Sequence, residues 1–534
     1  MPEERPSIVL FMVDQLAAKW LEGESKRACP TPNIDRLRAG GVSFGQCIVS
    51  NPICMAARAT LATGLTSRGH GVLQNGYELD PALPTFMHLL RQRRWRTGAF
   101  GKVHLIPHFH TVHPDYKPYG FDIVSCTEDP RAGEWLDWVE DEYPALYDSA
   151  LATIWATEIP ELTRYGKRGS DLSARIRDLR AKCQWATDRH PHGTAGYYTL
   201  PFPEEVSQTA WITRRAIEFL GKFAPHMPIF AQVSYVQPHS PSCPPEDHME
   251  RVDPRYIPAP IPPEWAVEGQ APDCFAGSEG AVSHLHLALG GEVRNEDATP
   301  DDWHARRHYY FADLTHLDDQ LGKVLAALDQ MGRSRSTYVV FLSDHGELLL
   351  DHGFTGKGER HYDACVRVPL VIAGPGLKAG STVDALVQLE DLCPTILDMA
   401  GVAYPEPTVL GPYHQGPKPR ALPGRSLLPL CRGEAVPRDW RDAAYVESYN
   451  NITSSDTACW ARTIRTSEWR YTMYPGGRGE QLFRIREDPN EMRNLAFDPR
   501  FASARTRLRD RLMELMVLQD YPHTPRSRFA LGVH

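Results

Sequence analysis

The sequence NPICMAARATLATGLTSRGH, residues 51–70, places a cysteine where a short apolar loop gives way to a helix-forming run. The alanines and the leucine over 56–63 favour a helix, and Gly64 supplies its stop. Unpaired N–H groups at a helix start stabilise an anionic nucleophile or a bound oxyanion, and Arg58 points the same way as Cys54. The stretch therefore predicts a reactive or anion-binding position at Cys54, although a buried structural cysteine followed by a surface arginine fits the same pattern.

Several apolar runs that predict buried β-strands end in polar side chains. Open α/β sheets bind ligands at the carboxyl ends of their strands, and parallel strands align those ends. We therefore expect these polar groups to meet at one site, although an acidic residue after a strand often only caps the next segment. The groups are Asp14 and Gln15 after Ser7–Val13, Lys102 and His104 after Arg96–Phe100, His239 after Pro228–Val236, and Asp344 and His345 after Thr337–Leu342.

Lys102 and His104 combine a fixed cation with a titratable group. Alternation along an extended chain predicts that both side chains lie on one side of the backbone. The nearby His108, His110 and His113 suggest a zinc site. Their spacing matches no common ligand set and no cysteine accompanies them, so we do not favour zinc here.

A metal site is predicted from the two acidic strand ends. Asp14, Gln15, Asp344 and His345 offer two carboxylates, an amide oxygen and an imidazole. This donor set suits one divalent ion of high coordination number, and a histidine among the ligands favours Mn²⁺.

Four motifs resemble those of formylglycine-dependent (type I) sulfatases, which belong to the alkaline phosphatase superfamily. The resemblance extends from Ile8 to about Pro499, with Ala56 in a position that is usually proline. The motifs are Cys54-Met55-Ala56-Ala57-Arg58 with Leu61, Thr63 and Gly64, the element TPNIDRL at 31–37, Gly101-Lys102-Val103-His104, and the stretch 488–496.

The resemblance implies a covalent mechanism and assigns roles. In that family a maturation enzyme oxidises the cysteine to formylglycine, whose hydrate attacks the sulfur or phosphorus of the substrate, and the bound metal is often Ca²⁺, the alternative to Mn²⁺ here. The implied catalytic residues are Cys54, Arg58, Lys102, His104, His239 and Lys357; the implied substrate contacts are Asn75, Lys102, His239 and Lys357; and the implied metal ligands are Asp14, Gln15, Cys54, Asp344 and His345.

Two activities fit this resemblance. The pair Lys102 and His104 favours a sulfatase acting on small-molecule sulfate monoesters, because phosphonate monoester hydrolases carry other polar residues there. Hydrolysis of phosphonate monoesters and phosphodiesters at the same site is the alternative. A third possibility, of a different class, is a non-catalytic ligand-binding relative in which Cys54 remains a thiol.

Composition fits an ordinary α/β enzyme. The 534 residues are 42% hydrophobic and 23% charged, and the net charge of −9 argues against a nucleic-acid partner. Eleven cysteines without a CxxC pair indicate neither a disulfide framework nor a zinc knuckle. The apolar run Ile8–Val13 is too short for a signal peptide or a membrane span, so we expect a cytoplasmic protein with no membrane partner. We also expect a homo-oligomer, a dimer or a tetramer.

The expected fold is α/β, with a large, mixed but mostly parallel sheet sandwiched by helices and a smaller C-terminal α+β subdomain with an antiparallel sheet. We assign 1–405 to the catalytic domain, the Pro/Gly-rich stretch 406–425 to a linker, and 426–534 to the subdomain with its extended tail. The segment 127–203 has no clear periodicity, and we expect an irregular insertion over the mouth of the active site.

Overall fold

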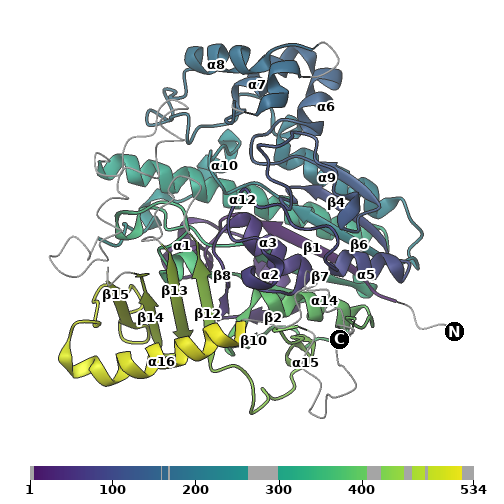
Figure 1. The fold of residues 1–534 in the computed structure, drawn as a ribbon. Coiled ribbons are helices and arrows are strands. Elements are labelled where there is room, and N and C mark those ends of the chain that lie inside the picture. Colours follow the sequence, from purple (N-terminus) through teal and green to yellow (C-terminus); the bar gives the residue numbers. More distant parts are fainter. Residues whose placement is uncertain are drawn as a thin grey trace, which may run out of the picture.

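The computed structural model describes residues 5–157, 159–165, 169–262, 299–405, 422–449, 460–475 and 479–519. These residues form a large sheet flanked by helices and a smaller sheet near the C-terminus (Figure 1). The predicted fold class is confirmed. Most of the predicted linker, 406–421, and the predicted tail, 520–534, lie outside the described residues, and the domain boundaries remain a prediction.

Eight strands form the main sheet in the order β10-β2-β9-β7-β1-β6-β4-β5. The strands from β7 to β5 are parallel, whereas β9 is antiparallel to both of its neighbours. Their bounds are β1 (Ser7–Val13), β2 (Gly41–Phe44), β4 (Arg96–Gly101), β5 (Ile123–Cys126), β6 (Ile229–Ser234), β7 (Thr337–Ser343), β9 (Leu370–Ala373) and β10 (Ser381–Val383). A small three-stranded sheet consists of β11 (Val387–Gln388), β3 (Cys47–Ile48) and β8 (Arg367–Val368).

The central strand β1 is apolar along its length because both of its faces are covered. Leu10 and Met12 lie in one apolar cluster with the buried faces of α3, α5 and α14. Phe11 and Val13 lie in another, with α2, α9 and α12. The helices are α1 (Gly23–Ala28), α2 (Pro32–Gly40), α3 (Cys54–Thr63), α4 (Ser67–His70), α5 (Phe86–Gln92), α6 (Glu134–Glu142), α7 (Tyr147–Ala152), α8 (Leu172–Lys182), α9 (Gln208–Gly221), α10 (Glu246–Arg251), α12 (Pro300–Gln330), α13 (Asp363–Val366), α14 (Leu392–Met399), α15 (Leu428–Cys431) and α16 (Ala502–Gln519).

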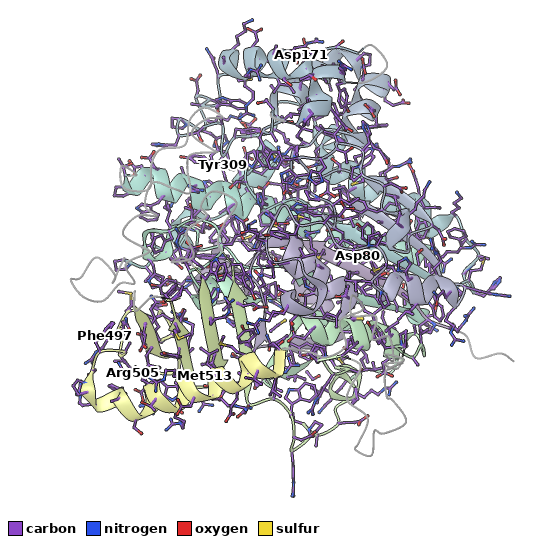
Figure 2. The ribbon with its side chains drawn as sticks, in the orientation of Figure 1. Asp80, Asp171, Tyr309, Phe497, Arg505 and Met513 are labelled. Atoms are coloured by element: carbon purple, nitrogen blue, oxygen red, sulfur yellow. The ribbon has the colours of Figure 1, made fainter. Side chains whose placement is uncertain are left out.

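The prediction of an irregular insertion over 127–203 is wrong. This part of the chain contains α6, α7 and α8, which lie together at the top of Figure 1. Trp135 and Leu151 are buried in the same cluster as Phe11, so the segment extends the core. Its helices are short, and of the three only α8 begins at a side-chain cap, Asp171 (Figure 2), so their 3.6-residue period is hard to recognise in the sequence.

The C-terminal sheet has the order β12-β13-β14-β15 and is antiparallel throughout. Leu508 and Leu512 of α16 pack on one face of this sheet, whereas Val446 and Phe483 join the core of the main sheet. The C-terminal sheet is therefore fixed to the part of the chain that forms the main sheet by buried apolar contacts. The strands are β12 (Ala443–Ser448), β13 (Ala461–Thr466), β14 (Trp469–Met473) and β15 (Glu480–Arg484).

Within the described residues, no helix combines the length and apolar character that a membrane span requires. The nine cysteines in this part of the chain are free thiols, and all but Cys183 are buried.

The buried Asp313 of α12 makes the stability of the fold depend on pH. Burial raises its pKa to about 8, although the guanidinium of Arg131 acts in the opposite direction. Because this pKa lies above the value of about 3.9 for an unfolded aspartate, the folded state binds more protons between the two values. Stability therefore falls as pH rises through this window, by on the order of 1.4 kcal/mol per unit of pKa shift.

We expect Asp313→Asn to raise the melting temperature at about pH 8 more than at about pH 5, because it removes a charge that the folded chain must bury. Melting curves at the two pH values measure the difference. Asp141→Asn, which removes an exposed acid of α6, provides the control. An equal shift at both pH values would contradict the assignment.

Candidate active site

Cys54 is the first residue of α3, a helix whose residues are all buried. The helix ends at Gly64, which has the left-handed backbone (φ 72°) that glycine adopts without strain. Asn75, predicted to contact substrate, accepts a hydrogen bond through Oδ1 from the backbone N–H of Met55 at 3.1 Å, and its role toward substrate stays a prediction. It therefore satisfies one of the free donors of the first turn, next to Cys54.

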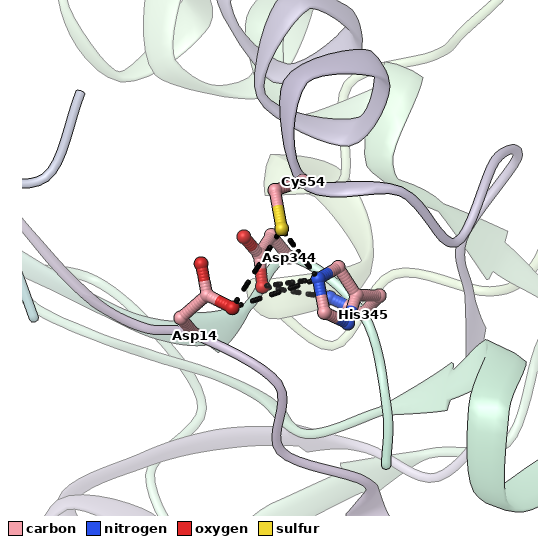
Figure 3. Close-up of side chains that lie close together, drawn as sticks. All are labelled: Asp14, Cys54, Asp344 and His345. Atoms are coloured by element: carbon pink, nitrogen blue, oxygen red, sulfur yellow. Dashed lines mark hydrogen bonds and ion pairs between the residues drawn. The ribbon is translucent and has the colours of Figure 1, made fainter. Parts of the chain in front are cut away.

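Three segments bring four ligand-type side chains together (Figure 3). Val13 of β1 pairs with Ser343 of β7, so Asp14 and Asp344, the next residues, are neighbours across the sheet edge. His345 Nε2 lies 3.6 Å from Asp14 Oδ1 and 3.7 Å from Asp344 Oδ1. Cys54 Sγ lies 3.2 Å from the same nitrogen.

This cluster fits a divalent metal ion. One ligand atom from each of Asp14, Cys54, Asp344 and His345 lies within 4.8 Å of the others, and all four residues are buried. The Nδ1 atom of His345 contacts the carbonyl of Gly346 at 3.0 Å. Since a carbonyl only accepts, Nδ1 carries a proton, and in the neutral ring Nε2 presents its lone pair to the cluster.

Gln15 links the cluster to Lys357. Its backbone N–H donates to Asp344 Oδ1 at 3.1 Å, and its side-chain Oε1 accepts from Lys357 Nζ at 2.8 Å. The Nε2 group donates to the carboxylate of Glu347. The ammonium of Lys357 therefore contacts two atoms of the site. One is the amide oxygen of Gln15, the predicted metal-ligand atom, and the other is Cys54 Sγ, which lies 2.8 Å from Nζ.

Arg58 holds the two carboxylates in place. Its guanidinium donates to Asp344 Oδ2 at 2.8 Å and to Asp14 Oδ2 at 2.9 Å. It also donates to the carbonyl of Lys102 at 2.7 Å and to Ser234 Oγ at 3.0 Å. Arg58 thus acts on the acidic groups around Cys54, and the prediction that it points toward the same site is consistent with this position.

Lys102 is fully buried between two carboxylates. Its Nζ atom lies 2.6 Å from Asp14 Oδ2 and 2.5 Å from Asp129 Oδ1. Burial lowers the pKa of Lys102, but the two carboxylates outweigh burial and raise it above its ordinary value. Lys102 is therefore a permanent cation of the site.

His104 reaches the site by a turn and not by strand alternation. Strand β4 ends at Gly101 (φ 89°), where a Cβ would lie 2.0 Å from the carbonyl of Ser234, and His104 itself has φ 52°. Glu128 Oε1 accepts from the backbone N–H of His104 at 2.9 Å and so fixes this strained turn. The expected convergence of Lys102 and His104 is present, but the extended backbone on which we based it is not.

The histidines that suggested zinc are not brought together. His108 Nδ1 lies 3.1 Å from His104 Nε2, and burial, with the charge of His104, lowers the pKa of His108 to about 3. His110 is exposed, and His113 pairs with Asp137 at 2.9 Å. His104, His108 and Asp129 do form a second group with metal-ligand geometry, but the ammonium of Lys102 already lies against Asp129.

His239 is partly buried in the loop after β6. Its Nδ1 atom contacts the carbonyl of Ser240 at 2.8 Å, so Nδ1 carries a proton. The charge of His239 contributes to lowering the pKa of Asp129.

The thiol of Cys54 is strongly activated. Burial raises its pKa, but Lys102, Lys357 and His345, together with a hydrogen bond from His104, lower it well below the ordinary value for cysteine. The site therefore stabilises negative charge on Sγ of Cys54, the atom bonded to Cβ.

Three acidic residues of the site were missed by sequence reasoning. Glu128 and Asp129 come shortly after the end of β5, and the rule that located Asp14 and Asp344 also applies to them. We had assigned their segment to the insertion instead. Glu347 adjoins the Asp344-His345 pair, and its carboxylate accepts hydrogen bonds from Gln15 and from the backbone N–H groups of Leu349 and Gly356.

A mixed α/β sheet with buried acids, lysines and histidines at its strand ends defines a hydrolase-type site, and sequence comparison identifies the family. The sulfatase family model matches residues 6–402, and a second model, the C-terminal part of N-sulphoglucosamine sulphohydrolase, matches 351–517. The chain belongs to the sulfatase family and has the alkaline phosphatase superfamily fold.

Individual relatives include sulfatases and phosphonate hydrolases. The chain is 25% identical to an arylsulfatase of Clostridium perfringens, over 92% of this chain and 90% of that protein. It is 29% identical to the multifunctional alkaline phosphatase superfamily protein PehA of Trinickia caryophylli, over 93% of each. The solved structure of a phosphonate monoester hydrolase of Agrobacterium radiobacter matches with a TM-score of 0.73 at 25% identity, over 96% of each chain.

Proposed function

We propose that this protein is a metal-dependent sulfatase that hydrolyses sulfate monoesters with a formylglycine nucleophile made from Cys54. The observation that best supports this proposal is the position of Cys54 Sγ at the start of a buried helix. It lies 2.8 Å from Lys357 Nζ and 3.2 Å from His345 Nε2. This sulfur stands in for a hydroxyl oxygen of the formylglycine hydrate. Membership of the sulfatase family supports the proposal.

Maturation requires a partner. Every residue of α3 is buried, so a formylglycine-generating enzyme cannot reach Cys54 in the folded chain. The modification must therefore take place before this helix packs against the sheet. We propose such an enzyme as an obligatory partner during synthesis.

The substrate oxygens are bound by ammonium groups. Lys357 contacts Cys54 Sγ and the amide oxygen of Gln15, and Lys102 contacts the carboxylate of Asp14. Each ammonium would exchange part of these contacts for a sulfuryl oxygen. Charge-assisted hydrogen bonds of this kind stabilise the charge that develops on the transferring group. His239, whose Nδ1 is bound to Ser240, would donate a proton from Nε2 to the leaving oxygen.

Release of sulfate needs a base at the second hydroxyl of the hydrate. One hydroxyl oxygen attacks sulfur and becomes the ester oxygen of the covalent intermediate. His104 takes the proton of the other hydroxyl, the aldehyde re-forms, and the carbon–oxygen bond to sulfate breaks. The hydrogen bond of His104 to Cys54 supports this role.

The donor set of this chain supports one divalent metal ion. A divalent ion, Mn²⁺ with Ca²⁺ as the alternative, held by Asp14, Gln15, Asp344, His345 and residue 54, would lower the pKa of a hydrate hydroxyl and screen the negative substrate. Arg58 keeps the two carboxylates oriented for this role.

Phosphonate monoester and phosphodiester hydrolysis is the second candidate. It is favoured by the similarity to PehA and to a phosphonate monoester hydrolase of known structure. Kinetics of the metal-loaded, matured enzyme on an aryl sulfate, an aryl methylphosphonate and a diaryl phosphate test the assignment. We expect the highest kcat/KM for the aryl sulfate; a wide preference for the phosphonate would transfer the assignment to the second candidate.

Lys102 discriminates between these substrates. A sulfate monoester offers three non-bridging oxygens, whereas a phosphonate monoester replaces one with carbon. Lys102→Ala should lower kcat/KM for the aryl sulfate about ten- to a hundredfold more than for the aryl methylphosphonate, because only the sulfate loses a charge-assisted hydrogen bond worth roughly 1.5–3 kcal/mol. Lys323→Ala, which removes an exposed lysine of α12, is the control. Equal losses on both substrates would refute this role.

We propose a catalytic domain over 1–405, a C-terminal subdomain over 426–534, and a cytoplasmic homo-oligomer, a dimer or a tetramer, that uses neither nucleic acid nor membrane as a partner. Sedimentation of the full chain measures the oligomeric state.

A further inference from the structure

Asp129 is a buried carboxylate inside a site that binds anions. Its side chain is almost completely enclosed, and its Oδ1 atom lies 2.5 Å from Lys102 Nζ. The same ammonium lies 2.6 Å from Asp14 Oδ2. One of the two lysines that would receive a substrate oxygen is thus shared between two acids.

The surroundings of Asp129 are otherwise cationic or titratable. His108 Nδ1 lies 3.8 Å from Asp129 Oδ2. Burial alone would raise the pKa of Asp129, but Lys102, His239 and His104 outweigh it and lower the pKa below its ordinary value. The carboxylate is therefore ionised at neutral pH.

The segment around Asp129 is also held by contacts that do not use its carboxylate. The segment is anchored through the backbone, because Trp155 Nε1 donates to the main-chain carbonyl of Asp129. The side-chain amide of Gln208 donates to Thr127 Oγ1 at 2.7 Å and to the main-chain carbonyl of Glu128 at 3.1 Å. The negative charge of Asp129 thus acts on the site and not on the loop.

We propose that Asp129 sets the charge of the substrate, admitting esters with one negative charge and rejecting phosphate monoesters with two. This inference rests on the proposed function for the identity of the anion site. Asp129 subtracts one charge from the Lys102 side of the site, whichever metal ion binds on the Asp14 side. Sulfate monoesters, phosphonate monoesters and phosphodiesters all carry a single charge and are admitted together.

The expected size of the effect follows from Coulomb's law. An oxygen bound to Lys102 lies about 5 Å from the Asp129 carboxylate, and an extra unit charge there, at an effective dielectric constant of about 20, is disfavoured by roughly two- to threehundredfold. Removing the carboxylate should remove this discrimination while leaving the attraction for monoanions in place.

The test is Asp129→Asn, which keeps the shape of the side chain and removes its charge. At about pH 8, where a phosphate monoester with a second pKa of about 6 is a dianion, kcat/KM is measured for an aryl phosphate and an aryl sulfate. We expect the phosphate-to-sulfate ratio to rise at least about tenfold. Asp141→Asn, which removes an exposed acid of α6, should leave the ratio unchanged.

A second measurement separates this inference from the proposed reaction. In a Cys54→Ala background, which cannot turn over, calorimetry gives the affinities for phenyl phosphate and phenyl sulfate with and without Asp129→Asn. A shift toward the dianion supports the role of Asp129 even if the wild-type enzyme hydrolyses no sulfate ester. If Asp129→Asn folds poorly, Asp129→Ser replaces it in both measurements, and melting curves identify that case.

Either experiment can overturn the proposal that Asp129 selects substrate charge. An unchanged phosphate-to-sulfate ratio in a folded variant, or a proportional loss on both substrates, would show that Asp129 does not select substrate charge. Unchanged relative affinities in the Cys54→Ala background would lead to the same conclusion.

Discussion

Cys54→Ala should abolish turnover, lowering kcat/KM by a factor of about 10⁴ or more, because it removes the atom that forms the covalent intermediate. The charged groups around residue 54 remain in this variant, so substrate still binds and only the chemical step is lost. Steady-state kinetics on the aryl sulfate measures the loss.

Two matched variants sharpen this experiment. Cys183→Ala removes a partly exposed cysteine far along the chain and should leave the rate unchanged. Cys54→Ser retains a hydroxyl but has no aldehyde to regenerate, so it should also be inactive in repeated turnover. Retention of more than about one hundredth of wild-type kcat/KM by Cys54→Ala would contradict a covalent role for residue 54.

Asp344→Ala and Asp14→Ala should each lose the bound metal, with a fall in kcat/KM of about a thousandfold. Each change removes a charged ligand and also leaves the guanidinium of Arg58 with one carboxylate instead of two. Elemental analysis of the purified proteins measures metal per chain, and activity is measured on the same samples.

The control for Asp344 is Asp363→Ala. Asp363 is also an acid in a close pair with a buried arginine, Arg465, at 2.9 Å, but it is the first residue of α13 and pairs there with β13 of the C-terminal sheet. Its loss should lower stability and leave metal content unchanged. Full metal occupancy in both Asp14→Ala and Asp344→Ala would refute the ligand assignment.

The elements that position the site could be predicted from the sequence because their signals are local. The unbroken apolar run Ser7–Val13 predicts a strand covered on both faces, and it is the central strand β1. Asp14 and Asp344 could be expected to meet because parallel strands end at the same edge, and the Val13–Ser343 register brings them together.

What could not be predicted depends on tertiary contacts. The turn that delivers His104 depends on Glu128 accepting its backbone N–H, a contact between segments with no shared pattern. The position of the Lys102 ammonium between Asp14 and Asp129 likewise depends on a tertiary contact. Asp129 follows β5, a short strand with little apolar periodicity. The bond from the backbone N–H of Met55 to Asn75 Oδ1 could not be predicted either, because it joins a turn to the open end of a helix 20 residues earlier in the chain.

The most direct test of the central claim is the mass of the tryptic peptide 39–58, which contains both Cys47 and Cys54. The protein is produced together with a formylglycine-generating enzyme, denatured, and treated with a thiol-alkylating reagent and a hydrazine. Cys47 is an internal control, because its thiol should be alkylated in every molecule. The account predicts one alkylated thiol and one hydrazone at residue 54 in the active enzyme. Two alkylated thiols in a fully active preparation would contradict it.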